Sequence, residues 1–219
     1  MGGHSRNIGK TSVMAGLIRE MKKLDWTAVK ITQYGHGICS HDGEPCGCAP
    51  AEHAFMLTEE RNTDGRADTC RFLAAGARRS LWLRARQGQL AEALPSLERA
   101  LAEDNWVMIE SNSILKFLKP SLYLVVLDHL QTDFKPSALE FLDRADALVP
   151  IESRMDGGEW AALDPRVFEG KPRFPVAARD YFSSDLCQFV RQRLLTPRAN
   201  LLWEAESRPT QKKEQPCQH

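Results

Sequence analysis

The sequence predicts an α/β fold, a three-layer α/β/α arrangement in which helices cover both faces of a mostly parallel sheet. Segments with strand-like and helix-like patterns alternate along the chain, which is typical of right-handed βαβ units. The segment 122–127 (LYLVVL) is apolar throughout, as strands are when helices cover both faces of a parallel sheet. With 219 residues, of which 42% are hydrophobic, the chain is long enough to bury one sizeable core.

The individual elements follow from hydrophobic periodicity and from helix-ending signals. A first helix is expected over about 10–24, because Val13, Leu17, Met21 and Leu24 recur at helical spacing. A strand is expected at 26–31 (WTAVKI), then an irregular segment at 32–50 and a short helix at 51–57. Further helices are expected at 68–76, with Gly76 as the C-cap, and at 90–103, 137–145 and 183–195. Further strands are expected at 80–84, 106–110, 122–127, 147–151 and 174–178.

The domain organisation follows from the point at which this pattern stops. Residues 1–196 form one predicted domain, into which the Cys- and His-rich segment 32–50 is inserted. From residue 197 the chain is polar, with prolines and charges. We therefore expect 197–219 to be a disordered tail.

The first eleven residues, MGGHSRNIGKT, contain a candidate phosphate-binding loop. Glycines let backbone N–H groups turn toward phosphate oxygens, the lysine reaches the β- and γ-phosphates, and the threonine hydroxyl can ligate Mg²⁺. The spacing from Gly3 is G-x₅-G-K-T, one residue longer than the usual motif, because position 4 is His4. A chance Gly-Lys-Thr at a helix start is the alternative, and the immediate change to helical periodicity argues against it. The candidate nucleotide-binding residues of the loop are Gly3, Asn7, Ile8, Gly9, Lys10, Thr11 and Ser12.

The loop has no strand in front of it, although a phosphate-binding loop normally follows a buried central β-strand. Met1 leaves no room for such a strand in the recorded sequence. We therefore expect the first strand to be missing from the recorded N-terminus. Loss of a central strand would leave its two neighbours unpaired.

Charge and composition argue against several classes of protein. Lys+Arg and Asp+Glu balance at 29 each, so no global field favours nucleic acid or an anionic membrane. No apolar run reaches the ~18 residues of a transmembrane helix, and the polar, glycine-rich N-terminus is not a signal peptide. Three of the six cysteines lie within ten residues, which is not a spread disulfide framework. We expect a cytoplasmic protein that binds neither nucleic acid nor membrane.

Several segments resemble known families of P-loop NTPases. The loop GHSRNIGKT has the glycine spacing of dethiobiotin synthetase. Segments 68–83 (DTCRFLAAGARRSLWL) and 29–37 (VKITQYGHG) resemble parts of the molybdopterin-guanine dinucleotide biosynthesis protein MobB. Segment 106–113 (WVMIESNS) lies where both families have a strand that ends in glutamate. The likeness covers most of residues 1–150 and implies a P-loop NTPase domain.

The resemblance also implies roles for individual residues. Gly9, Lys10 and Thr11 would hold phosphate and Mg²⁺, and Glu110 would be the acidic residue near Mg²⁺ or a catalytic water. This makes Lys10 and Glu110 the catalytic candidates, and Thr11 and Glu110 the Mg²⁺ ligands. Open α/β sheets bind ligands outside the carboxyl ends of their strands, which is where Glu110 lies. Lys30, also at a strand end, is expected to contact a phosphate or a substrate anion, with a surface lysine as the open alternative.

The segment 36–48 (HGICSHDGEPCGC) is a candidate metal site. Thiolates and imidazoles close together fit zinc or an iron–sulfur cluster. The C-x₆-C-x-C spacing lacks the usual C-x₂-C pair, so a thiol loop without metal and a chance grouping stay open. Because the segment follows the second strand, it is expected near the γ-phosphate. Its candidate ligands are His36, Cys39, His41, Cys46 and Cys48.

Together these patterns predict an enzyme that binds ATP or GTP with Mg²⁺ and hydrolyses it. The resemblance to MobB implies an accessory step in metallocofactor biosynthesis of the molybdenum cofactor type, a partner protein from that process and a homodimer. Two alternatives stay open: an ATP-dependent ligase or kinase that acts on a small carboxylate, and a nucleotide-dependent adaptor with little turnover. The chain has no N-K-x-D signature after 147–153 (ALVPIES), so the nucleotide base stays open.

Overall fold

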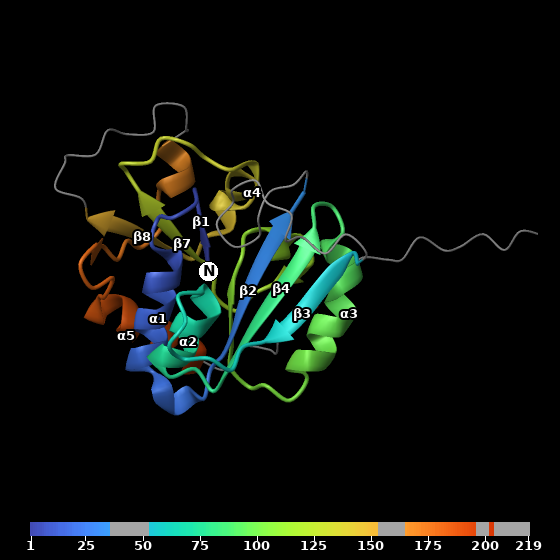
Figure 1. The fold of residues 1–219 in the computed structure, drawn as a ribbon. Helices are drawn as coiled ribbons and strands as arrows, with labels where there is room; N and C mark the ends of the chain where they lie inside the picture. Colours follow the sequence, from blue (N-terminus) through green and yellow to red (C-terminus); the bar gives the residue numbers. More distant parts are fainter. Residues whose placement is uncertain (36–52, 153–164, 196–201, 204–219) are drawn as a thin grey trace, which may run out of the picture.

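The computed structural model describes residues 1–35, 53–152, 165–195 and 202–203 (Figure 1). The helical elements are α1 (Lys10–Glu20), η1 (Lys22–Leu24), α2 (Asp68–Ala75), α3 (Leu90–Leu101), η2 (Ser113–Lys116), α4 (Pro136–Leu139), η3 (Leu142–Arg144), η4 (Pro165–Phe168) and α5 (Ser184–Leu195). The strands are β1 (Gly2–Gly3), β2 (Thr27–Tyr34), β3 (Phe55–Glu59), β4 (Arg79–Arg86), β5 (Val107–Glu110), β6 (Leu118–Lys119), β7 (Leu124–Asp128), β8 (Ala147–Glu152), β9 (Val176–Ala177) and β10 (Leu202–Trp203).

The central sheet has two four-stranded parts, ordered β3-β4-β2-β5 and β1-β7-β8-β9. Neighbouring strands run parallel, except that β3 runs antiparallel to β4. The backbone of Met1 connects the two parts. Its nitrogen donates to the carbonyl of Ile109 at 2.6 Å, and its carbonyl accepts from the nitrogen of Ser111 at 3.0 Å. These two bonds place β5 beside β1.

Helices cover both faces of the sheet. One core cluster joins α1, α2 and α5 to one face, and a second joins α3, η2 and η3 to the other. Figure 1 shows α1, α2 and α5 together on one side of the sheet and α3 on the other. Strand β7 contributes to both clusters, because Leu124 and Val126 face the first while Val125 and Leu127 face the second. The predicted fold class, a three-layer α/β/α arrangement with a mostly parallel sheet, is confirmed.

The first strand is short rather than wholly missing. Gly2 and Gly3 form β1 and pair in parallel with Val125 and Val126 of β7. This strand could not be predicted from the pattern of residues, because two glycines carry no side chain that could show the alternation of a strand.

Other differences from the predicted elements lie at the edges of the fold. The predicted helix at 51–57 is wrong: residues Phe55–Glu59 form β3. Pairing with β4 decides this, since Phe55 and Leu57 lie on the same side of the strand and pack against the α3 core. The predicted helix at 137–145 is replaced by two short elements, α4 and η3. Within the predicted tail, Leu202–Trp203 form β10, paired with β6.

Candidate functional site

The phosphate-binding loop runs from β1 to α1 and has the backbone of a tight anion cradle. Gly9, at the N-terminus of α1, has φ 85°, and Asn7 has φ 54°, conformations that favour glycine and asparagine. A Cβ on Gly3 would lie 2.7 Å from Cδ of Lys10 and 2.9 Å from Cδ1 of Ile8. A side chain at position 3 would therefore require the Lys10 and Ile8 side chains to shift.

The side chain of Asn112 holds the start of the loop in place. Its Oδ1 accepts from the nitrogen of Gly3 at 3.0 Å, and its Nδ2 donates to the carbonyl of Gly3 at 2.9 Å. These bonds follow directly after the two that Met1 makes with β5. The Asn112 amide thus continues the pairing between β5 and β1 by one step, with a side chain in place of backbone.

Lys10 lies inside the loop and is held by loop backbone. Its Nζ donates to the carbonyl of Ser5 at 2.6 Å. Burial lowers the pKa of Lys10, and the charge of Glu110 opposes that shift. A phosphate group would supply the counter-charge that the Ser5 carbonyl provides only in part.

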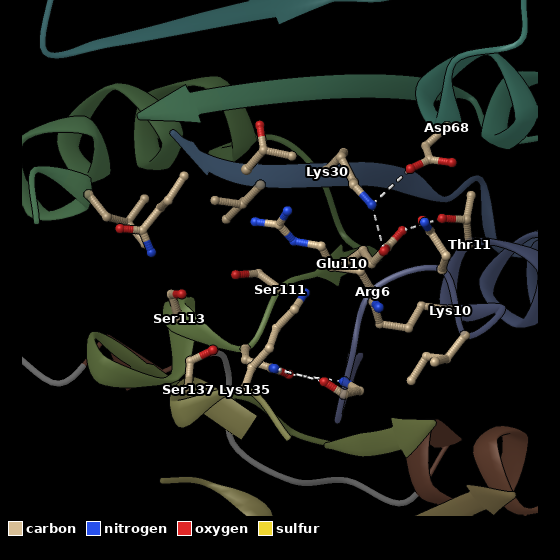
Figure 2. Close-up of a pocket in the computed structure, with 18 of the residues that line it drawn as sticks. Arg6, Lys10, Thr11, Lys30, Asp68, Glu110, Ser111, Ser113, Lys135 and Ser137 are labelled. Atoms are coloured by element: carbon tan, nitrogen blue, oxygen red, sulfur yellow. Dashed lines mark hydrogen bonds and ion pairs between the residues drawn. The ribbon is translucent and has the colours of Figure 1, made fainter. Parts of the chain in front are cut away.

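A charged cluster lies at the carboxyl end of β5, beside the middle of β2 (Figure 2). Lys30 and Glu110 are register partners on these strands, and Lys30 Nζ lies 2.6 Å from Glu110 Oε1 and 2.8 Å from Asp68 Oδ2. Thr11 Oγ1 donates to Glu110 Oε2 at 2.8 Å. Both oxygens of Glu110, a residue only 2% exposed, therefore have partners, as a buried carboxylate requires.

The ionisation of this cluster follows from its contacts. Burial by itself would lower the pKa of Lys30, but Glu110 and Asp68 outweigh it and raise that pKa. Burial would raise the pKa of Asp68, and the ammonium of Lys30 outweighs it, so that pKa is lowered. Lys30 is thus a cation held between two carboxylate groups.

The oxygen atoms around Lys30 fit a magnesium ion. Mg²⁺ takes oxygen ligands, usually one or two carboxylates with phosphate oxygens and water. The hydroxyl of Thr11 and the carboxylates of Glu110 and Asp68 are such ligands, and a cation, the Lys30 ammonium, already lies between the two carboxylates. In the described part of the chain, no group of three or more His, Cys, Asp or Glu residues could hold a metal by itself.

These residues line one large, open and mostly polar pocket, with a volume of about 1350 Å³. The predicted site residues that the structure brings together there are Gly3, Asn7, Ile8, Gly9, Lys10, Thr11, Ser12, Lys30 and Glu110. The five candidate metal ligands His36, Cys39, His41, Cys46 and Cys48 lie outside the described residues.

Several residues of the pocket were not predicted from the sequence. Asp68 was predicted only as the start of a helix. An acidic residue in the first turn of a helix that follows a strand could have indicated that it belongs to the site. Arg71, one turn further along α2, donates from Nη2 to the Ser12 hydroxyl at 2.8 Å. Asn112 and Lys135 line the pocket too, and nothing in the local sequence pattern distinguishes them from surface residues.

Comparisons with known proteins identify no family for the chain. No protein-family model matches it, and no curated protein does either. A solved structure with a similar fold is that of HypB from Helicobacter pylori in complex with nickel. It aligns over 88% of this chain and 85% of that chain, with a TM-score of 0.46 and 14% sequence identity. Among the described residues, none of the helices combines the length and the apolar character needed to cross a bilayer.

Proposed function

We propose that this protein binds a nucleoside triphosphate with Mg²⁺ and hydrolyses it. The observation that carries the proposal is the contact between the loop and the sheet end: Thr11, the last residue of the G-x₅-G-K-T loop, donates to Glu110 at the carboxyl end of β5. A phosphate cradle and an acidic oxygen cluster then share one pocket. That combination is what phosphoryl chemistry needs, because catalysis there is mainly positioning and charge neutralisation.

The loop supplies the phosphate contacts. Backbone N–H groups at the start of α1 and the positive end of that helix face the phosphates. Lys10 exchanges the Ser5 carbonyl, now 2.6 Å away, for the β- and γ-phosphate oxygens. The exchange replaces a neutral acceptor by a charged one, and hydrogen bonds to charged partners are roughly twice as strong.

Thr11, Glu110 and Asp68 would hold the magnesium ion. When bound, the ion would neutralise charge on the β- and γ-phosphates. Lys30 must then leave the position between the two carboxylates, and the phosphates would replace the carboxylates as the counter-charge of its ammonium. Thr11 donates to Oε2 of Glu110, and Oε1, which Lys30 contacts in the structure and would then leave, is the acceptor that would orient an attacking water.

A finer assignment rests on the resemblance to MobB. We propose an accessory role in metallocofactor biosynthesis, with the Cys- and His-rich segment as the metal-handling part. Its position in the chain, directly after β2, supports this, because Thr32 and Gln33 near the end of β2 line the pocket. Metal analysis of anaerobically purified protein tests this part, and a metal-free sample that still binds nucleotide with Mg²⁺ would remove it.

The experiment for the main proposal compares the wild type with Lys10→Ala. Equilibrium binding of ATP and of GTP is measured with Mg²⁺ present, and phosphate release is measured on the same samples. Lys10→Ala should weaken binding by at least about tenfold, the effect of losing one charge-assisted contact. The matched control is Lys119→Ala, which removes an exposed lysine on β6. A wild type that binds neither nucleotide would refute the proposal, and tight binding without phosphate release would favour the adaptor.

A further inference from the structure

We infer that the part of the pocket beyond the phosphate loop binds a second small molecule, through a carboxylate or phosphate group that contacts Lys135. The inference rests on the proposed function, because it places this second ligand beside the terminal phosphate of a bound nucleotide. It names the substrate class that the same pocket would accept.

The pocket is larger than a single nucleotide requires. Sites for one small ligand usually measure about 300–1,000 Å³, whereas this pocket measures about 1350 Å³. Away from the loop it is lined by uncharged polar residues from several elements, so the additional space is suited to a polar ligand. These residues include Gln33, Gln87, Ser111, Ser113 and Ser137.

Lys135 is fixed at the border between the loop and this additional space. Its backbone nitrogen donates to the carbonyl of His4 at 2.9 Å, which ties the residue to the start of the loop. Figure 2 shows its side chain pointing into the pocket on the side of Ser111 and Ser137, away from Thr11. Lys135 is thus held in position to contact a ligand that also touches the phosphates.

The ammonium of Lys135 lacks a counter-charge. Among the described residues it makes no hydrogen bond or ion pair, and Asp133, the acidic neighbour, accepts instead from the Ser5 hydroxyl at 2.6 Å. Burial, together with the positive charges of Lys10 and Arg6, lowers the pKa of Lys135 to about 7. A half-buried cation without a partner is unfavourable, so an anionic ligand at this position would be stabilised.

The other positive charges of the pocket have partners or belong to the loop. Arg71 lies 3.7 Å from Asp68, and Arg6 is a loop residue that has other interactions. Lys30 is paired with Glu110 and Asp68. Lys116 is paired with Glu140 at 3.0 Å. Lys10 would contact the phosphates of a bound nucleotide. The uncompensated positive charge in the rest of the pocket therefore lies at Lys135. A carboxylate or phosphate on a small polar molecule meets this requirement.

The test is carried out in two steps on the full chain. First, a β,γ-imido triphosphate and Mg²⁺ are titrated into the protein. Then malonate and inorganic phosphate are titrated separately into the loaded protein by calorimetry. We expect saturable binding of at least one of these dianions, and a preference between them identifies the acceptor group as carboxylate or phosphate.

Variants connect this binding to Lys135. Lys135→Met should weaken dianion binding by about tenfold or more, the effect of one charged contact, while nucleotide affinity stays within about twofold. Lys135→Arg should retain the binding, and Lys119→Met is the charge-matched control outside the pocket. Circular dichroism checks that each variant is folded.

Two results would overturn the inference: a loaded wild type that binds neither dianion, or a Lys135→Met variant that loses nucleotide rather than dianion affinity. Failure of the wild type to bind nucleotide would instead remove the proposed function. The same dianion titrations would then be carried out on the nucleotide-free protein, where binding that is lost in Lys135→Met supports the inference and the absence of binding overturns it.

Discussion

Replacing Lys30 by methionine tests whether the charged cluster beside the carboxyl end of β5 is a cation site. In the wild type the ammonium lies 2.6 Å from Glu110 and 2.8 Å from Asp68. Methionine has a similar length but no charge, so Lys30→Met leaves the two carboxylates facing each other with no cation between them. We expect a less stable protein that binds Mg²⁺ more tightly in the absence of nucleotide.

The size of the effect follows from the burial of the two carboxylates. Leaving a buried charge without its partner costs about 3–5 kcal/mol, and Glu110, 2% exposed, belongs in that class. Asp68 is 35% exposed, so water solvates it and it adds little. Because Thr11 still donates to Glu110, we expect the free energy of unfolding to fall by about 3 kcal/mol, the lower end of this range.

Urea unfolding with and without Mg²⁺ measures both parts of this prediction. Mg²⁺ at about 100 times its Kd should restore about 2.7 kcal/mol to Lys30→Met, and less to the wild type, in which Lys30 must first be displaced. The double variant Lys30→Met/Glu110→Gln should be more stable than Lys30→Met, because the buried charge is gone, and should not respond to Mg²⁺. If Lys30→Met is as stable as the wild type, or if Mg²⁺ stabilises both equally, the reasoning about a shared cation position is wrong.

Three further predictions concern other parts of the molecule. Gly76→Ala should lower the free energy of unfolding by about 1–2 kcal/mol, because Gly76 ends α2 with φ 103°; urea unfolding measures this, and an unchanged midpoint contradicts it. Asn112→Leu should lower the free energy of unfolding by about 1–3 kcal/mol, because both hydrogen bonds to Gly3 are lost. Urea unfolding measures this loss, and a binding titration on the same sample should show weaker nucleotide binding. The affinity of the loaded protein for sulfate, whose charge is constant near neutral pH, should fall as the pH rises through about 7, where Lys135 loses its proton, and should stay level in Lys135→Arg. The charged neighbours that set this pKa are Lys10, Arg6, Lys30 and Asp133.

The parts of the site that could be predicted from sequence are those encoded locally. The loop and the helix after it form one continuous motif, so Gly9, Lys10 and Thr11 were identified together. Glu110 was identified as a residue at a strand end, where open α/β sheets bind ligands. The same expectation for Lys30 is wrong, because β2 continues to Tyr34 and Lys30 lies in its middle, beside the end of β5. The ion pair of Lys30 and Glu110 was not predicted, because it depends on the register between β2 and β5, which neither strand specifies alone.

The missed features depend on partners far away in the chain. Asp68 reaches Lys30 only because α2 packs beside α1 and presents its first turn to the pocket. The segment 51–57 contains alanine, methionine, leucine and glutamate, which favour helices, yet pairing with β4 makes residues Phe55–Glu59 a strand. In both cases tertiary contacts decide the outcome, as they often do for short segments.

The bonds between Asn112 and Gly3 also have a mechanical consequence. Glu110, the acidic residue of the cluster, and Asn112, which holds the phosphate loop, are only two residues apart. If replacing Lys30 by another cation at Glu110 shifts the end of β5, Asn112 should move with it. Gly3, which is bonded to the Asn112 side chain, would then move as well. If the proposed function holds, the binding of Mg²⁺ and the binding of phosphate would be coupled through residues 110–112 alone, without the movement of a domain.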